Sequence, residues 1–170
     1  MNCPSCGHEN IDGTDRCDNC LAPFRDLDVP RADAAEGLAR SVMEDNLGRL
    51  EKEETITVSP ETPVLEVVRL MKGANSGCAL VVDGGKLAGI FTEHDALLKM
   101  TGTGARPTTT AVKELMTSSP EELHEQDSVA AALNKMSMGR YRHIPVKKND
   151  ASYSVTSIKS VLIYIAKEDW

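Results

Sequence analysis

The sequence predicts an α/β (α+β) fold in which one β-α-β-β-α unit occurs twice in tandem, preceded by a small cysteine-rich segment. Two observations lead to this prediction. Residues 53–170 align with themselves without a gap when the sequence is shifted by 65 positions, and four of the five cysteines lie within the first 20 residues. We therefore divide the chain into the regions 1–28, 29–52, 53–110 and 111–170.

The cysteines of the first region follow a pattern that favours a metal site. They form two Cys-x-x-Cys pairs: Cys3 with Cys6, and Cys17 with Cys20. Two such turns can hold Zn²⁺ through four thiolates at about 2.3 Å. The region has few large apolar side chains, so metal binding would supply the stability that hydrophobic burial cannot. Its pattern of Cys-Pro-x-Cys-Gly followed by Cys-x-x-Cys resembles short zinc ribbons. Gly7, and Asn19 in the second pair, are expected to supply left-handed backbone. A redox dithiol or disulfide pair is the alternative.

Region 29–52 is predicted to be a linker that becomes an amphipathic helix. Val29-Pro30 breaks the chain, because the residue before proline is pushed into extended geometry, and Asp33 can cap the helix. Apolar residues then recur mostly at three- and four-residue steps, at Leu38, Val42, Met43, Leu47 and Leu50. We expect this stripe to pack on the main domain. The alternative, a coiled-coil seam, needs more heptads than the region provides.

The two remaining regions show the same order of elements. In 53–110 we expect strand, helix, strand, strand and helix at 56–58, 64–71, 78–82, 87–91 and from 92 onward. Asp83-Gly84-Gly85 predicts a type I′ hairpin between the two middle strands. In 111–170 the matching helix, two strands and final helix are expected at 129–136, 144–146, 153–156 and 160–165.

This order, spacing and recurrence resemble the CBS domain, and two copies resemble a Bateman module. The resemblance covers residues 53–170 and rests on Thr57–Val64, Ala79–Asp83, Gly89–Asp95 and Arg142–Val146. It implies a cleft between the repeats for an adenine nucleotide or adenosyl ligand, such as AMP, ATP or S-adenosylmethionine. It also implies a homodimer formed through the CBS repeats.

Five residues of the first repeat are candidates for ligand binding. Gly89 can leave room for a ligand ring near the backbone. Thr92 places a hydroxyl at a helix N-terminus, where a phosphate is favoured. Asp95 can accept hydrogen bonds from ribose hydroxyls, and the resemblance places Thr57 and Ala79 near the adenine. The alternative is that Thr92 and Asp95 form only a helix cap.

The second repeat offers fewer candidates. Arg142 and His143, with Arg140 nearby, form a basic cluster that can hold a phosphate, although an ordinary solvated turn is the alternative. Ser157, the counterpart of Thr92, completes the set. Three departures lead us to expect one competent site rather than two: Glu122, Ser154 and Ser160 stand where the first repeat has Thr57, Gly89 and Asp95.

Composition and charge narrow the function. A formal net charge of −7 argues against nucleic-acid binding, which needs a basic surface. No apolar run approaches the roughly 20 residues that span a bilayer, and the N-terminus lacks signal-peptide features, so we expect a cytoplasmic protein without membrane partners. No catalytic triad or Cys-His pattern is present, so we expect no enzyme. The leading hypothesis is a regulatory module that senses an adenosine ligand and acts on an unknown protein partner. The alternative is a ligand-free interaction scaffold with degenerate CBS sites.

Overall fold

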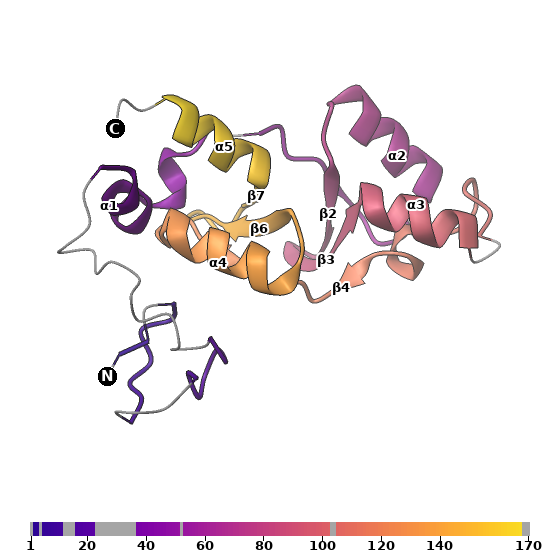
Figure 1. The fold of residues 1–170 in the computed structure, drawn as a ribbon. Coiled ribbons are helices and arrows are strands. Elements are labelled where there is room, and N and C mark those ends of the chain that lie inside the picture. Colours follow the sequence, from indigo (N-terminus) through magenta and orange to yellow (C-terminus); the bar gives the residue numbers. More distant parts are fainter. Residues whose placement is uncertain are drawn as a thin grey trace.

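The structure is a computed structural model that describes residues 2–3, 5–11, 16–22, 37–51, 53–102 and 105–167 (Figure 1). Its helices are α1 (Gly37–Glu44), α2 (Val64–Gly73), α3 (Glu93–Gly102), α4 (Val129–Gly139), α5 (Ile158–Lys167) and the short 3₁₀ helices η1 (Leu47–Arg49) and η2 (Val112–Glu114). Its strands are β1 (Thr57–Val58), β2 (Cys78–Asp83), β3 (Lys86–Thr92), β4 (Thr117–Ser118), β5 (Leu123–His124), β6 (His143–Lys147) and β7 (Tyr153–Ser157). The predicted break at Val29-Pro30 and the cap at Asp33 lie outside the described residues.

The first repeat contains β1, α2, β2, β3 and α3 in the predicted order. β1 pairs with β2 in parallel, and β2 pairs with β3 in an antiparallel hairpin that closes at Asp83 and Lys86. Gly84 and Gly85 have φ angles of 54° and 81°, as a type I′ turn requires, so the hairpin prediction is confirmed. β4 joins the free edge of β3 and completes a four-stranded sheet.

The second repeat has the same design, built from β5, α4, β6, β7 and α5. β5 and β6 are parallel, β6 and β7 are antiparallel, and together they form a three-stranded sheet. The 65-residue shift converts the pair Val58–Val81 of the first sheet into the pair Leu123–Val146 of the second. The predicted α/β fold with two tandem repeats is therefore confirmed.

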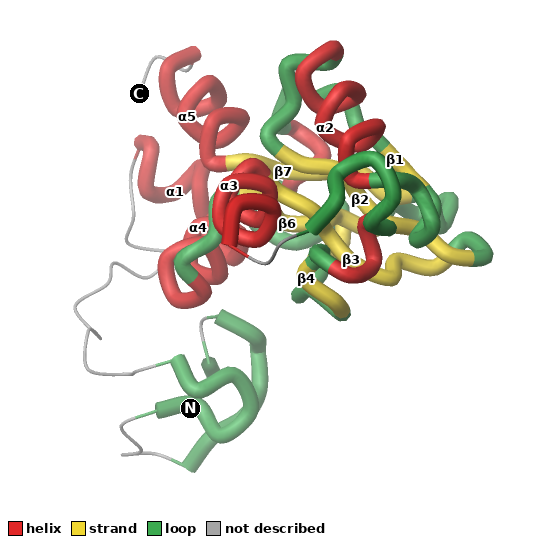
Figure 2. Tube along the Cα trace, turned by 90° about the vertical axis from the view of Figure 1, so that its right-hand side faces the viewer, coloured by secondary structure: helices red, strands yellow, loops and turns green. Residues whose placement is uncertain are grey.

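The first sheet buries a different set of side chains on each face, because successive strand residues point to opposite sides. Val81 and Phe91 lie in a core with Val64 and Val67 of α2. The opposite face carries Leu80 and Ile90, which contact Val155 of β7. Figure 2 shows β6 and β7 next to β2 and β3, with α1, α4 and α5 on the side of the second sheet. The two repeats therefore share an apolar interface.

The segment that precedes each repeat packs on the other repeat. Val42, Leu47 and Leu50 lie in the core of the second repeat, and Figure 1 shows α1 beside α4 and α5. Conversely, Val112 and Leu115 lie in the core of the first repeat. Two isolated bridges show the symmetry of this crossing, because the 65-residue shift converts one into the other: Asn46–Ser128 and Pro63–Ala111.

The predicted amphipathic helix is shorter than expected. α1 ends at Glu44, and the Asn46 side chain caps η1 by accepting a hydrogen bond from the Gly48 N–H. The Asp45 N–H still donates to the Ser41 carbonyl, and the Asp45 carbonyl accepts a hydrogen bond from the Val129 N–H in the second repeat. The apolar stripe does pack on the main domain, as predicted. Its last two residues, however, are not part of α1: Leu47 lies in η1, and Leu50 directly follows η1.

Candidate functional site

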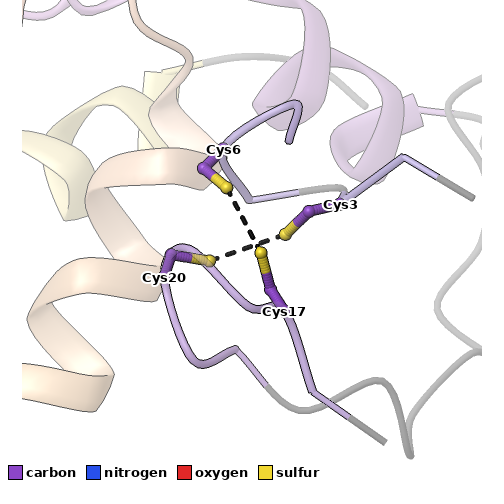
Figure 3. Close-up of side chains that lie close together, drawn as sticks. All are labelled: Cys3, Cys6, Cys17 and Cys20. Atoms are coloured by element: carbon purple, nitrogen blue, oxygen red, sulfur yellow. Dashed lines mark hydrogen bonds between the residues drawn. The ribbon is translucent and has the colours of Figure 1, made fainter. Parts of the chain in front are cut away.

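The four cysteines of the N-terminal segment form one cluster. Figure 3 shows the Sγ atoms of Cys3, Cys6, Cys17 and Cys20 pointing toward one another, and all four lie within 4.8 Å of one another. Two of these distances are 3.5 Å, between Cys3 and Cys20, and 3.6 Å, between Cys6 and Cys17. Sulfurs placed tetrahedrally at about 2.3 Å from a central ion stand about 3.8 Å apart, so the donor set fits a thiolate-bound metal.

Two equivalent backbone turns direct these sulfurs inward. In the first turn the Cys3 N–H donates to the His8 carbonyl, and the Cys3 carbonyl accepts from the Gly7 N–H. In the second turn Cys17 makes the matching hydrogen bonds with Ala22 and Leu21. The apolar cluster behind them contains only Cys3, Cys17 and Ala22 as buried residues of the described part. Such a small core cannot stabilise the segment by hydrophobic burial.

The left-handed residue follows the second cysteine in both turns. Gly7 has a φ angle of 71°, as predicted, and Leu21 has 59°. The prediction for Asn19 is therefore wrong, since Asn19 lies between the cysteines of its pair and not after them. Its side-chain amide instead donates to the Cys6 Sγ at 3.7 Å. A hydrogen bond of this kind orients a thiolate ligand and offsets part of its charge.

The second candidate site is a cleft of about 770 Å³ between the two repeats. Three segments line it: the end of β3 with the start of α3, the stretch from β4 toward β5, and the turn from α4 into β6. Its apolar lining includes Ile90, Leu97 and Pro145. Its polar lining includes Thr92, Glu93, Asp95, Glu121, Arg140, Arg142 and His143.

Thr92 and Asp95 form a reciprocal cap at the start of α3. The Asp95 N–H donates to Thr92 Oγ1 at 3.2 Å, while the Thr92 N–H and hydroxyl donate to Asp95 Oδ2 at 3.0 and 2.7 Å. Asp95 Oδ1 pairs with Lys99 Nζ at 2.8 Å, and Lys99 also donates to the Leu115 carbonyl at 2.8 Å. The helix cap that the sequence allowed is therefore present, and Lys99 ties it to the chain that leads into β4.

The turn from α4 into β6 supplies the fixed positive charge of the cleft. Within the described ranges, neither Arg140 nor Arg142 forms an ion pair or a side-chain hydrogen bond. Burial lowers the pKa of His143 below 6.5, although the nearby carboxylates of Glu53 and Glu93 oppose this shift. The imidazole is therefore mainly neutral at pH 7, and the two guanidinium groups carry the charge.

Glu121 connects two of the lining segments. Its Oε2 accepts hydrogen bonds from Lys135 Nζ at 3.0 Å and from the Tyr141 hydroxyl at 2.8 Å, and these donors lower the pKa of Glu121. The Tyr141 ring packs so closely over Gly139 that a Cβ there would lie 1.9 Å from a ring carbon. Lys99 neutralises Asp95, and Lys135 neutralises Glu121. The main uncompensated charges of the cleft lining are therefore the positive charges of Arg140 and Arg142 and the negative charge of Glu93.

The structure brings four of the predicted ligand-binding residues together and places four elsewhere. Thr92, Asp95, Arg142 and His143 line the cleft, whereas Thr57, Ala79, Gly89 and Ser157 are not part of its lining. Ala79 is fully buried in the core of the first repeat. Thr57 is an exposed residue of the edge strand β1. Thr57 and Ala79 therefore lie outside the lining of this cleft, and their place near an adenine stays a prediction.

Gly89 is required by packing inside the chain. It pairs with Ser118 of β4, and an added Cβ would lie 2.4 Å from Met116 Sδ and 2.8 Å from the Thr117 carbonyl oxygen. The space that the sequence suggested for a ligand ring is therefore filled by β4 and the residue before it. Gly89 positions the β4 wall of the cleft and does not face its interior.

Ser157 has a partner that its counterpart Thr92 lacks. Ser157 and Ser160 form the same reciprocal cap at the start of α5. The Ser157 hydroxyl also donates to the carboxylate of Glu53, which lies just before β1. A carboxylate of the chain therefore engages the hydroxyl that a phosphate would need in the second half-site.

The sequence did not reveal Glu121, Tyr141 or Glu53 as site residues. Tyr141 stands inside the basic cluster that the sequence identified, so its place in the cleft could have been inferred. The contacts of Glu121 with Tyr141 and of Glu53 with Ser157 span 20 and 104 residues. No periodicity or motif marks pairs at such separations.

Comparison with known proteins determines the family. The family model for the CBS domain matches residues 39–102 and 112–156, which is more than half of the chain. The chain belongs to the CBS domain family. The match confirms the resemblance of the two repeats, and the cysteine cluster lies outside the matched ranges. In the part of the chain that the structure describes, no helix has the length and apolar character needed to cross a bilayer.

Curated relatives share part of their length with this CBS pair. CBS domain-containing protein CBSCBSPB1 of Arabidopsis thaliana is 34% identical over 107 residues, which are 63% of this chain and 19% of that protein. Meiotically up-regulated gene 70 protein of Schizosaccharomyces pombe is 31% identical over 107 residues, which are 62% of this chain and 15% of that protein. The chain thus spans a fifth or less of the length of these two relatives.

Solved structures have the same fold. CBS-domain containing protein ATU1752 from Agrobacterium tumefaciens has a TM-score of 0.63 and 25% identity, covering 71% of this chain and 98% of that chain. The CBS domain pair of protein MJ0100, in complex with 5′-methylthioadenosine and S-adenosyl-L-methionine, has a TM-score of 0.64 and 20% identity. The match covers 71% of this chain and 99% of that chain. CBSX2 in complex with AMP has a TM-score of 0.60 and 19% identity, and the match covers 72% of this chain and 96% of that chain.

Proposed function

We propose that this CBS pair binds an adenosine ligand in the cleft between its repeats and acts as a regulatory module. The observation that carries the proposal is the composition of one cavity. It holds the Thr92 hydroxyl and the N-terminus of α3 together with the guanidinium groups of Arg140 and Arg142. CBS domains are generally regulatory and non-catalytic. The complexes of MJ0100 and CBSX2 support AMP and S-adenosylmethionine as candidate ligands.

The lining suits the parts of such a ligand. Ile90 and Pro145 offer apolar surface to a purine. The positive end of the α3 dipole attracts a negative group, and Arg142 presents a planar fork that binds a phosphate or carboxylate through two hydrogen bonds. Asp95 Oδ1 has one described partner, Lys99, and a carboxylate oxygen accepts two hydrogen bonds. It can therefore accept one from a ribose hydroxyl without losing its cap.

Calorimetry with AMP, ATP and S-adenosylmethionine tests this proposal. We expect Arg142→Gln to weaken binding of AMP by about tenfold or more, because it removes a charge-assisted bidentate contact. Arg69→Gln is a matched control, since Arg69 is also exposed but lies on α2, outside the cleft lining. Both variants should keep the wild-type Tm. Absence of binding by all three ligands at millimolar concentration would refute the proposal.

We expect one ligand per chain. In the second half-site the Ser157 hydroxyl donates to the Glu53 carboxylate, whose charge repels a phosphate, whereas in the first half-site Lys99 neutralises the carboxylate of Asp95. Ser160 also lacks the carboxylate that Asp95 provides in the first repeat. A calorimetric stoichiometry of two AMP molecules per chain would show that this half-site is open.

We propose that the cysteine cluster holds one structural Zn²⁺. Four thiolates in a small, weakly apolar segment support zinc, which binds such donor sets without redox chemistry. The ion would stabilise the two turns, and the Asn19 amide would orient the Cys6 ligand. Elemental analysis of the purified protein should give one zinc per chain. Replacing Cys17 with serine should lower that content, whereas replacing the isolated Cys78 with serine should not.

A ligand-free scaffold that associates through its CBS repeats is the second candidate function. The closed networks Thr92–Asp95–Lys99 and Glu53–Ser157 favour it, because the polar groups are satisfied without a ligand. Leu97 and Leu162, which the 65-residue shift relates, are 66% and 59% exposed and support a homodimer interface. Light scattering should give twice the mass of the chain. A dimer that binds no nucleotide would favour the scaffold.

A further inference from the structure

We propose that Arg140 is a phosphate-binding residue of the cleft and that the fold holds it there in a strained backbone conformation. The proposal rests on the proposed function and deepens it, because it assigns the Arg140 guanidinium of that cavity to the ligand phosphate and explains its backbone conformation. Arg140 directly follows α4, lines the cleft and has φ and ψ angles of 55° and 34°. This left-handed region is unfavourable for residues other than glycine, asparagine and aspartate.

The first repeat shows that the fold does not need an arginine at this position. The 65-residue shift places Arg140 on Asn75, which has a φ angle of 50° and lies two residues after the end of α2. The two helix ends thus require the same backbone geometry. Asparagine suits that geometry because its short polar side chain tolerates the left-handed region. Helix termination therefore explains Asn75 but leaves the choice of arginine at 140 unexplained.

The cleft supplies the missing explanation. Arg140 is exposed, has no described ion-pair partner and lies two residues before Arg142 on the same turn. Five non-glycine residues of the described chain have positive φ, and two of them, Ser119 and Arg140, line this cleft. Strained residues concentrate where the surrounding structure fixes a binding group. Two guanidinium groups from one turn would then hold a ligand phosphate together.

The alternative role of Arg140 is to stabilise the C-terminus of α4 by its positive charge, which complements the helix dipole. Arg140→Asn separates the two roles, because it removes the charge and relieves the backbone strain. If Arg140 binds phosphate, the variant should have a Tm about 2 °C higher than wild type and should bind AMP at least about tenfold more weakly. Its affinity for adenosine, which has no phosphate, should remain unchanged.

Ala151→Asn is the matched control. Ala151 has a φ angle of 63° in the turn between β6 and β7 and is not part of the cleft lining. This variant should raise the Tm in the same way and leave AMP affinity unchanged. The two variants together show whether relief of strain and loss of binding are separable at Arg140.

Each other outcome overturns the inference. An unchanged or lower Tm of Arg140→Asn assigns Arg140 to the helix end. If Arg140→Asn keeps the wild-type affinity for AMP, or loses equal affinity for AMP and adenosine, Arg140 does not contact the phosphate. Either result leaves the proposed function unaffected. Failure of the wild-type protein to bind either AMP or adenosine refutes the proposed function and this inference with it.

Discussion

Replacing Leu47 with alanine should destabilise the second repeat, although Leu47 precedes the first repeat in the sequence. Leu47 is 5% exposed and packs in one core with Leu123, Val129 and Ile144. The substitution removes three carbons, which at about 0.8 kcal/mol per buried CH₂ amounts to about 2.4 kcal/mol of transfer free energy. The cavity that remains should bring the loss of unfolding free energy to about 3 kcal/mol.

Urea denaturation followed by circular dichroism measures this loss, with a lower midpoint and an unchanged slope. Leu70→Ala on α2 is the control, because Leu70 is 45% exposed and its truncation should change stability by less than about 0.5 kcal/mol. Amide hydrogen exchange should show that Leu47→Ala reduces protection more in α4 and α5 than in α2. A loss below about 1 kcal/mol, or a loss of protection confined to α2, would show that the crossed packing does not support the second repeat.

Three further predictions follow from contacts described above. Gly89→Ala should lower the unfolding free energy by about 2 kcal/mol or more, because its Cβ would lie 2.8 Å from the Thr117 carbonyl oxygen. Gly73→Ala is the control in thermal denaturation and should not cause this loss, because its Cβ meets nothing within 4 Å. Tyr164→Phe removes a 2.6 Å hydrogen bond to Asp45 and should cost about 1.5–3 kcal/mol in urea unfolding at pH 7. That hydrogen bond lowers the pKa of Asp45 in the folded state, so its stabilising contribution is present above the unfolded pKa and is lost as pH falls. The unfolding free energies of wild type and variant should therefore converge below about pH 4. An equal difference between them at pH 3 and pH 7 would contradict this assignment. If the cysteine cluster holds Zn²⁺ as proposed, chelation should expose four thiols to a thiol reagent and leave Cys78 unreactive, since Cys78 is 2% exposed and burial raises its pKa to about 12; a fifth reactive thiol would mean that the CBS pair opens as well.

The sequence predicted the local features of the fold well, because they depend on neighbouring residues. Two glycines after Asp83 impose a type I′ turn, and their positive φ angles agree with it. The 65-residue repeat predicted the three strands that the two sheets have in common, since similar sequences form similar strand pairings. Four cysteines at metal-ligand spacing predicted a cluster that the structure places together. The pair of Thr92 with Asp95 was predicted as either a ligand site or a cap, and the cap is present.

The remaining features depend on which surfaces meet, and periodicity does not contain that information. The stripe of Leu47 and Leu50 predicts a buried face, but not that the face belongs to the second repeat. Gly89 suggests a close approach, and only the structure shows that Met116 is the neighbour. Glu53 gives no signal in the sequence, because its partner Ser157 lies 104 residues away.

The crossed packing of α1 with η1 and of η2 limits how this chain can be divided. A cut between the repeats does not yield two self-sufficient halves, because each half would lose apolar side chains that the other side of the cut supplies. A fragment that starts at residue 53 contains both complete repeats but lacks Leu47 and Leu50, so it would have a cavity in the core of the second repeat. Fragments that omit the cysteine cluster should therefore begin before residue 37, so that the cleft between the repeats keeps the packing that supports it.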